Sequence, residues 1–88
     1  MNDAITDRVS QMTEAQTVEG LKVLRSMNAA AVSCWDDSTK RVRAELLFAL
    51  EDVHGWSEYQ VDRIDAEIFF DAATLANVDL MYAEGVYA

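Results

Sequence analysis

Apolar positions along this chain recur at helical spacing, and no stretch alternates convincingly in the way that a strand requires. The clearest stripe follows residues 38–54, where apolar side chains recur on one side of a helix. Its members are Val42, Leu46, Ala49, Leu50 and Val53. Because such positions face a common neighbour, this helix is expected to be central, with Leu47 and Phe48 widening its buried face.

Three further segments carry stripes of the same kind. One helix is predicted over residues 3–12, a second begins after Thr13, and another begins after Ser57. Their inward-facing positions are Ile5, Val9 and Met12 in the first, Val18, Leu21, Leu24 and Met27 in the second, and Val61, Ile64, Ile68, Ala72 and Leu75 in the last. These stripes predict amphipathic helices that pack around a shared core.

Capping residues mark where the helices begin and end. Thr13 and Gln16 have the spacing of a capping box, in which two side chains satisfy backbone N–H groups at a helix start, and Ser57 and Gln60 repeat it. The central helix can be capped by Asp36, Asp37 or Ser38. Gly55 suits the left-handed position after that helix.

Asp71 falls beside the apolar stripe of the last segment, which predicts a kink or break there. A final helical segment is expected over residues 73–84, ending at Gly85. The chain as a whole, residues 1–88, is therefore predicted to be a single all-α domain, a compact bundle of four to five short helices. Because the connections are short, sequential helices are expected to pack as antiparallel neighbours.

Charge divides the molecule into two unlike halves. The net charge is -9, and the whole excess follows Ala44: ten acidic residues accompany only Arg63 there, whereas the first half is balanced. This distribution argues against a helix-turn-helix that reads DNA, because phosphate contacts supply most of the affinity in such complexes. It argues against binding to anionic membranes for the same reason.

Three carboxylates of the last segment form a stripe of their own. Glu58, Asp62 and Asp65 lie at helical spacing, with Phe69 beside them, and Glu51 and Asp52 end the preceding helix. Aromatic side chains flanked by carboxylates are typical of protein-binding surfaces. We therefore predict that these six residues contact a basic protein surface. A solvated acidic face, with Phe69 packed beneath the terminal segment, is the alternative.

Lys40, Arg41 and Arg43 form a basic island in the first turns of the central helix. The helix dipole disfavours cations at that position, so a second interaction is expected to hold them there. One interpretation is pairing with nearby acids or with the acidic half, in the same or another subunit. The other is an anion site, because free N–H groups at a helix start attract phosphate.

Nothing in the sequence predicts catalysis, a cofactor or a metal site. His54, the one histidine, lies at a helix end where a capping role is expected, and Cys34 has no second cysteine to pair with. Glycine-rich phosphate loops and calcium-binding loops are absent from the sequence. With no signal peptide and no long apolar run, a cytoplasmic protein is expected.

In size, acidity and absence of a recognisable site, the chain resembles the small phage-encoded inhibitors of bacterial immunity, the anti-CRISPR and anti-restriction proteins. The resemblance is one of general character and assigns no residue a role. It implies a non-catalytic inhibitor in the host cytoplasm, whose acidic helical face blocks a basic, nucleic-acid-binding groove. Two alternatives remain: an oligomeric nucleotide binder that uses Lys40, Arg41 and Arg43, and a structural homodimer.

Overall fold

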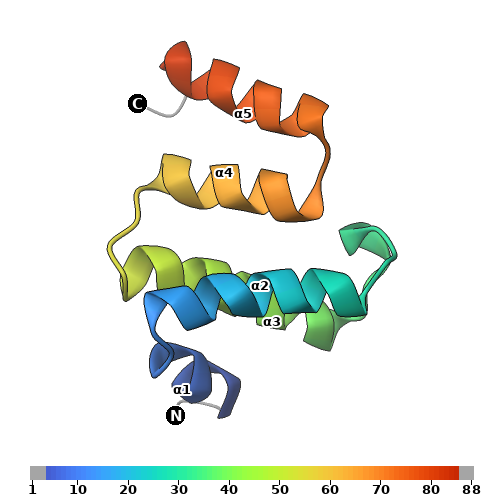
Figure 1. Cartoon of the computed structure of the whole chain (residues 1–88), viewed down its shortest axis with the longest axis vertical. Helices are drawn as coiled ribbons and strands as arrows, with labels where there is room; N and C mark the ends of the chain where they lie inside the picture. Colours follow the sequence, from blue (N-terminus) through green and yellow to red (C-terminus); the bar gives the residue numbers. More distant parts are fainter. Residues whose placement is uncertain (1–3, 86–88) are drawn as a thin grey trace.

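The computed structural model describes residues 4–85, and these residues form five α-helices and a short 3-10 turn, η1 (Val32–Cys34). The helices are α1 (Ala4–Ser10), α2 (Glu14–Met27), α3 (Asp37–Asp52), α4 (Glu58–Phe69) and α5 (Ala72–Ala83) (Figure 1). The described residues contain no strand. The predicted all-α bundle is confirmed.

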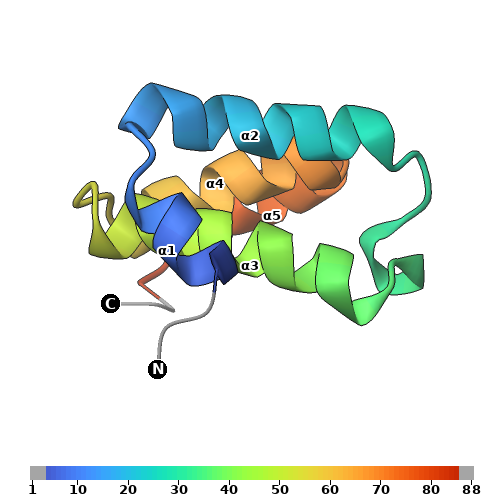
Figure 2. The ribbon, with the colours of Figure 1, turned by 90° about the horizontal axis from the view of Figure 1, so that it is seen from below.

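The helices follow one another along the longest dimension of the molecule, which is 39 Å. Figure 1 shows α1 at one end, α2 and α3 beside each other, then α4, and α5 at the other end. α3 packs against α1, α2 and α4, which confirms its central place. The expectation that all sequential helices pack together is wrong for α1 and α2, because α1 packs chiefly on α3 (Figure 2).

Local capping chemistry sets most of the helix boundaries. Both predicted capping boxes form: the side chains of Thr13 and Ser57 accept hydrogen bonds from the backbone N–H groups of Gln16 and Gln60, whose side chains accept in return. The carboxylate of Asp36 accepts from the backbone N–H of Thr39, 2.8 Å away, and begins α3. These bonds satisfy N–H groups that have no partner within the helix.

The predicted break at Asp71 is present. α4 ends at Phe69, and the carboxylate of Asp71 accepts a hydrogen bond of 2.8 Å from the backbone N–H of Thr74 to begin α5. Gly55 and Gly85, each with φ of 75°, follow the ends of α3 and α5 in the left-handed conformation. A glycine adopts this conformation without the steric strain that a side chain would cause.

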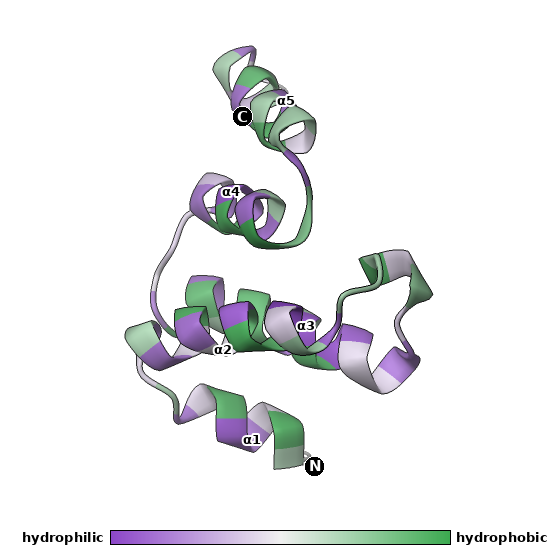
Figure 3. Cartoon of the chain, turned by 45° about the vertical axis from the view of Figure 1, so that its right-hand side comes forward, coloured by the Kyte–Doolittle hydropathy of each residue, from purple (hydrophilic) through white to green (hydrophobic). Residues whose placement is uncertain are grey.

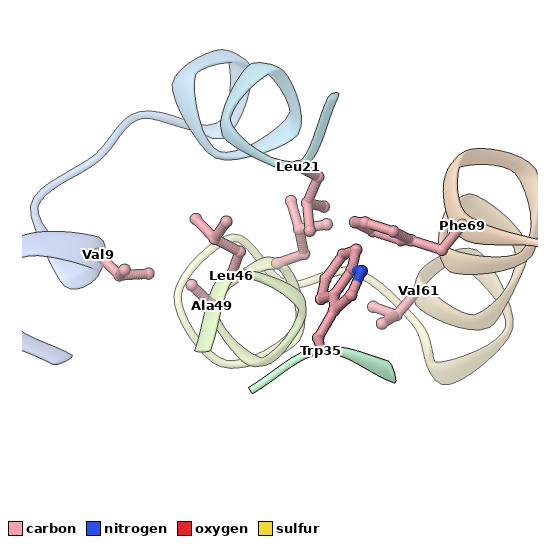
Figure 4. Packing of buried hydrophobic residues seen from close by; sticks show 8 residues of the cluster. Val9, Leu21, Trp35, Leu46, Ala49, Val61 and Phe69 are labelled. Atoms are coloured by element: carbon pink, nitrogen blue, oxygen red, sulfur yellow. The ribbon is translucent and has the colours of Figure 1, made fainter. Parts of the chain in front are cut away.

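The core lies where α2, α3 and α4 meet (Figure 4). Leu21 and Leu50 are completely buried there, and Trp35, from the segment between α2 and α3, packs edge-on against Phe69 with 5.6 Å between ring centroids. The indole N–H of Trp35 donates to the carbonyl of Ala30, so its polar atom is satisfied. Trp35 thus anchors the long connection between α2 and α3.

Four residues assigned to buried stripes lie on the surface instead, and one of them is Ala72, the first residue of α5. Phe48 is 65% exposed, Val53 is 50% exposed and Met27 is 76% exposed. Phe48 follows Leu46 by two residues, which is about 200° around a helix and therefore places it on the opposite side. Val53 and Met27 lie at helix ends, where the chain leaves the core.

Candidate protein-binding surface

The most buried ion pair of the described chain joins the basic island to the acidic half. The guanidinium of Arg43 donates to both carboxylate oxygens of Asp65 at 2.6 Å, and its Nε donates at 3.0 Å. The two side chains are only 18% and 20% exposed. The guanidinium also lies 5.2 Å from the ring centroid of Phe69 and 5.7 Å from that of Phe70. This cluster joins α3 to α4.

Burial raises the pKa of the Asp65 carboxyl, and the hydrogen bonds and charge of Arg43 act in the opposite direction. Burial disfavours the ionised form because water no longer solvates it, whereas a bidentate guanidinium favours that form. Asp65 is therefore held by its own chain and is a poor contact for a partner. Its interaction is a structural link between two helices.

The other residues predicted to form the acidic stripe differ in how exposed they are. Asp62 is half-buried and accepts a hydrogen bond of 2.7 Å from the hydroxyl of Tyr82. Phe69, which we expected at the surface, is 5% exposed and belongs to the core, so this expectation is wrong. Glu58 is exposed at the start of α4. The stripe therefore does not present a uniform row of carboxylates, because the helix turns part of it toward Arg43 and α5.

The basic island does not converge on one site either. Arg43 binds Asp65, Arg41 lies 3.7 Å from Glu45 on the same helix, and Lys40 is exposed. Both of these acids belong to the acidic half of the same chain. The geometry therefore shows the predicted pairing for two of the three cations, and it does not gather all three around an anion.

A different acidic surface lies on the outer side of α3, centred on Phe48. Glu51 and Asp52 are three and four residues beyond Phe48, on the same face of the helix, and both are exposed. Glu45 lies three residues before Phe48, about one turn nearer the start of the helix. Among residues 4–85, the side chains of Glu51 and Asp52 have no hydrogen bond or ion pair.

Two shallow hollows flank the ring of Phe48. A hollow of about 260 Å³ between α3 and α4 is lined by Phe48 together with Glu51 and Asp62. A second, of about 140 Å³ between α3 and α1, is lined by Phe48 together with Glu45 and Asp52. An exposed aromatic ring thus stands between two pairs of carboxylates. We call Glu45, Phe48, Glu51, Asp52 and Asp62 the Phe48 surface.

Sequence reasoning found three members of this surface, Glu51, Asp52 and Asp62, but missed its centre. The signal was present: Phe48 lies opposite Leu46 and Leu50 on a helical wheel. Because Phe48 was assigned to a wide apolar stripe, its position on the outer side of the helix was overlooked. That Asp62 lies beside Phe48 followed only from the packing of α4 against α3.

The two residues considered for catalysis, His54 and Cys34, do not belong to the Phe48 surface. His54 is half-buried, with its Nε2 3.5 Å from the hydroxyl of Thr17, and Cys34 is exposed on η1. Within residues 4–85, no three histidine, cysteine or carboxylate side chains gather in a way that could hold a metal ion.

Comparison with protein-family models, with curated proteins and with solved structures finds no match to this chain. None of the helices in the described part of the chain is both long and apolar enough to cross a bilayer.

Proposed function

We propose that this chain is a non-catalytic protein-binding domain that attaches to a basic partner through the Phe48 surface. The observation that carries the proposal is the 65% exposure of Phe48 between carboxylates that lie on both sides of its ring. The ring inserts into an apolar pocket of the partner. Glu45, Glu51 and Asp52 meet lysine or arginine side chains at the rim of that pocket.

The energetics favour an aromatic anchor surrounded by charge. Burying an aromatic side chain at an interface contributes a large apolar area, and such anchors dominate measured binding energies. α3 holds Phe48 on a regular helix whose opposite face is buried, so little backbone entropy is lost on binding. The net charge of -9 accelerates encounters with a basic surface and disfavours acidic ones.

The partner class that fits best is a nucleic-acid-binding protein, which is consistent with the resemblance to inhibitors of bacterial immunity. Carboxylates one helical turn apart are about 5–6 Å from each other and can occupy neighbouring cationic subsites of a phosphate-binding groove. The proposed protein acts as an inhibitor in the cytoplasm of a bacterial host, with no direct contact to nucleic acid or membrane. It requires no cofactor.

The test is capture followed by displacement. The chain is immobilised, exposed to a bacterial lysate and washed, and retained proteins are eluted with an excess of duplex DNA or of RNA and identified. A retained nucleic-acid-binding protein that nucleic acid displaces is the expected result. The purified partner should then lose its nucleic acid when the free chain is added.

Variants locate the surface. Phe48→Ala and the pair Glu51→Lys with Asp52→Lys should each abolish retention. The matched controls are Leu80→Ala, an exposed apolar residue on α5, and Glu19→Lys with Glu67→Lys, two exposed acids elsewhere. If both surface variants still retain the partner, the proposed surface is refuted. It is also refuted if the control substitutions reduce retention as much as the surface substitutions do. Displacement by neither nucleic acid would refute the proposed partner class.

A further inference from the structure

An apolar groove lies at the end of the molecule away from α5. Because α1 and α2 both rest on α3, a space of about 420 Å³ remains between them. Its floor is formed by Val42 and Leu46 of α3. Its walls are formed by Val9 of α1 with Met12 of the turn that follows it, and by Leu24 and Met27 of α2. This volume is within the range of small-molecule sites, roughly 300–1,000 Å³.

Gly20 keeps part of this groove free. A Cβ atom at Gly20 would lie 3.4 Å from the terminal methyl of Met12 and 3.5 Å from Leu46, so any larger side chain would enter the space between the helices. Two of the walls end in methionine side chains, which are unbranched and adapt to the shape of an apolar ligand. Met27 is 76% exposed, so its side chain is free to fold over an occupant.

The groove is continuous with a polar recess. A neighbouring hollow of about 420 Å³ is lined by Arg8, Gln11, Met12 and Gln16, and it shares Arg8 and Met12 with the apolar groove. Within the described part of the chain, the guanidinium of Arg8 has no ion pair or hydrogen bond. The Oε1 atom of Gln16 accepts from the backbone N–H of Thr13, and the residue is exposed, so its amide N–H groups can reach a ligand.

We propose that this groove binds a small anionic amphiphile, with one aliphatic chain in the apolar part and a carboxylate beside Arg8. The charge complementarity carries the choice: among the described residues that line the apolar groove, the one charged side chain is that of Arg8, a cation, and the amides of Gln11 and Gln16 add further donors at the same end. A guanidinium binds a carboxylate through charge-assisted hydrogen bonds.

The size of the groove favours a short chain over a helical peptide. α1, which forms one wall, has only seven residues and is therefore about 10 Å long. A peptide helix bound through several turns would extend well beyond this wall. A single aliphatic chain fits beside α1 and leaves its head group at Arg8, near the end of that helix.

The probe is decanoate, titrated below its micelle concentration into the isotopically labelled chain and followed by NMR. Saturable shifts of the methyl groups of Leu24, Val42 and Leu46 are expected. Decyltrimethylammonium, which has the same chain and a cationic head, should bind at least about tenfold more weakly, because the head group loses its charge-assisted hydrogen bonds. Arg8→Glu should weaken decanoate binding by about the same factor.

Val23→Lys adds a charge to the wall of the groove at a residue that is already 45% exposed, and it should abolish binding. Val53→Lys, at a 50% exposed residue outside the groove, is the matched control and should leave binding unchanged. Sedimentation of each variant shows whether a second copy covers the groove. A dimer that Val23→Lys separates, equal binding of the two amphiphiles, or no saturation with decanoate would each overturn the proposal.

Discussion

α4 packs against α3 on one side and α5 on the other, and both contacts contain an arginine–aspartate pair. Arg43 and Asp65, between α3 and α4, are 18% and 20% exposed, whereas Arg63 and Asp79, between α4 and α5, are 47% and 42% exposed. In the first pair, the guanidinium of Arg43 also lies against the rings of Phe69 and Phe70. The same kind of ion pair is therefore shielded from water in one contact and solvated in the other, and its loss is expected to change stability more in the shielded contact.

The two contacts also differ in burial. α3 and α4 each contribute three buried residues, whereas none of the residues of α5 is buried although most of them are apolar (Figure 3). α5 is held by the Tyr59 and Tyr82 rings, 4.9 Å apart, and by the hydrogen bonds of Asp79 to Tyr59 and Arg63. A helix attached in this way is expected to contribute less to global stability.

Removing a core side chain should have the largest effect. Leu50→Ala leaves a cavity at a completely buried position of α3, and the free energy of unfolding should fall by about 2–5 kcal/mol. Leu80→Ala, at a 55% exposed residue of α5, should change it by less than about 0.5 kcal/mol. Urea denaturation followed by circular dichroism measures both. Similar losses in the two variants would contradict the difference in burial.

Hydrogen exchange compares the two regions without a mutation. Amides in the middle of α3 should exchange only on global unfolding, whereas those of α5 should exchange by local opening, roughly a hundredfold faster. Mass spectrometry of peptic fragments resolves the two helices. Equal protection of α3 and α5 would show that α5 is part of the same cooperative unit.

Breaking the buried ion pair should cost less than emptying the core. Arg43→Met leaves the carboxylate of Asp65 poorly solvated and without its partner, and should lower the free energy of unfolding at pH 7 by about 1–3 kcal/mol. Arg63→Met removes an exposed pair and should have no measurable effect.

The loss in Arg43→Met should depend on pH. Burial already raises the pKa of Asp65, and removing Arg43 raises that pKa further. A raised carboxyl pKa means that the folded protein binds the proton more tightly than the unfolded chain does. The unfolded-state pKa of Asp65 is the same in both proteins, so stability of the variant relative to the wild type should increase as the pH falls from 7 through the folded-state pKa of the variant toward that of the wild type. If Arg43→Met lowers the free energy of unfolding by the same amount at pH 7 and at pH 4, this linkage is contradicted.

The smallest measurable effect is expected at the start of α4. Ser57→Ala removes the side-chain acceptor of a capping box and should lower the free energy of unfolding by about 1 kcal/mol. Ser57→Asp keeps an acceptor and should restore most of that stability. If the aspartate variant is as unstable as the alanine variant, the hydrogen bond to the backbone of Gln60 is not what stabilises this helix start.

The sequence by itself determined the helices and most of their ends. Thr13, Ser57 and Gly55 act through hydrogen bonds and backbone conformations within a few residues, so local chemistry was sufficient to place them. The break at Asp71 was visible from helical periodicity, because that carboxylate falls beside the apolar stripe. The buried positions of α3 near Leu46 and Leu50 followed from helical periodicity, because one face of a central helix has to be covered.

Only the tertiary structure decided which acids and aromatic residues are available at the surface. Asp65 and Phe69 were expected to face a partner, but Arg43 of another helix and Trp35 of a distant loop cover them. Phe48 was expected to be buried, but none of the helices within residues 4–85 covers its side of α3, and it is exposed. Helical periodicity tells which residues share a face, whereas the neighbour that covers that face depends on contacts between segments far apart in the chain.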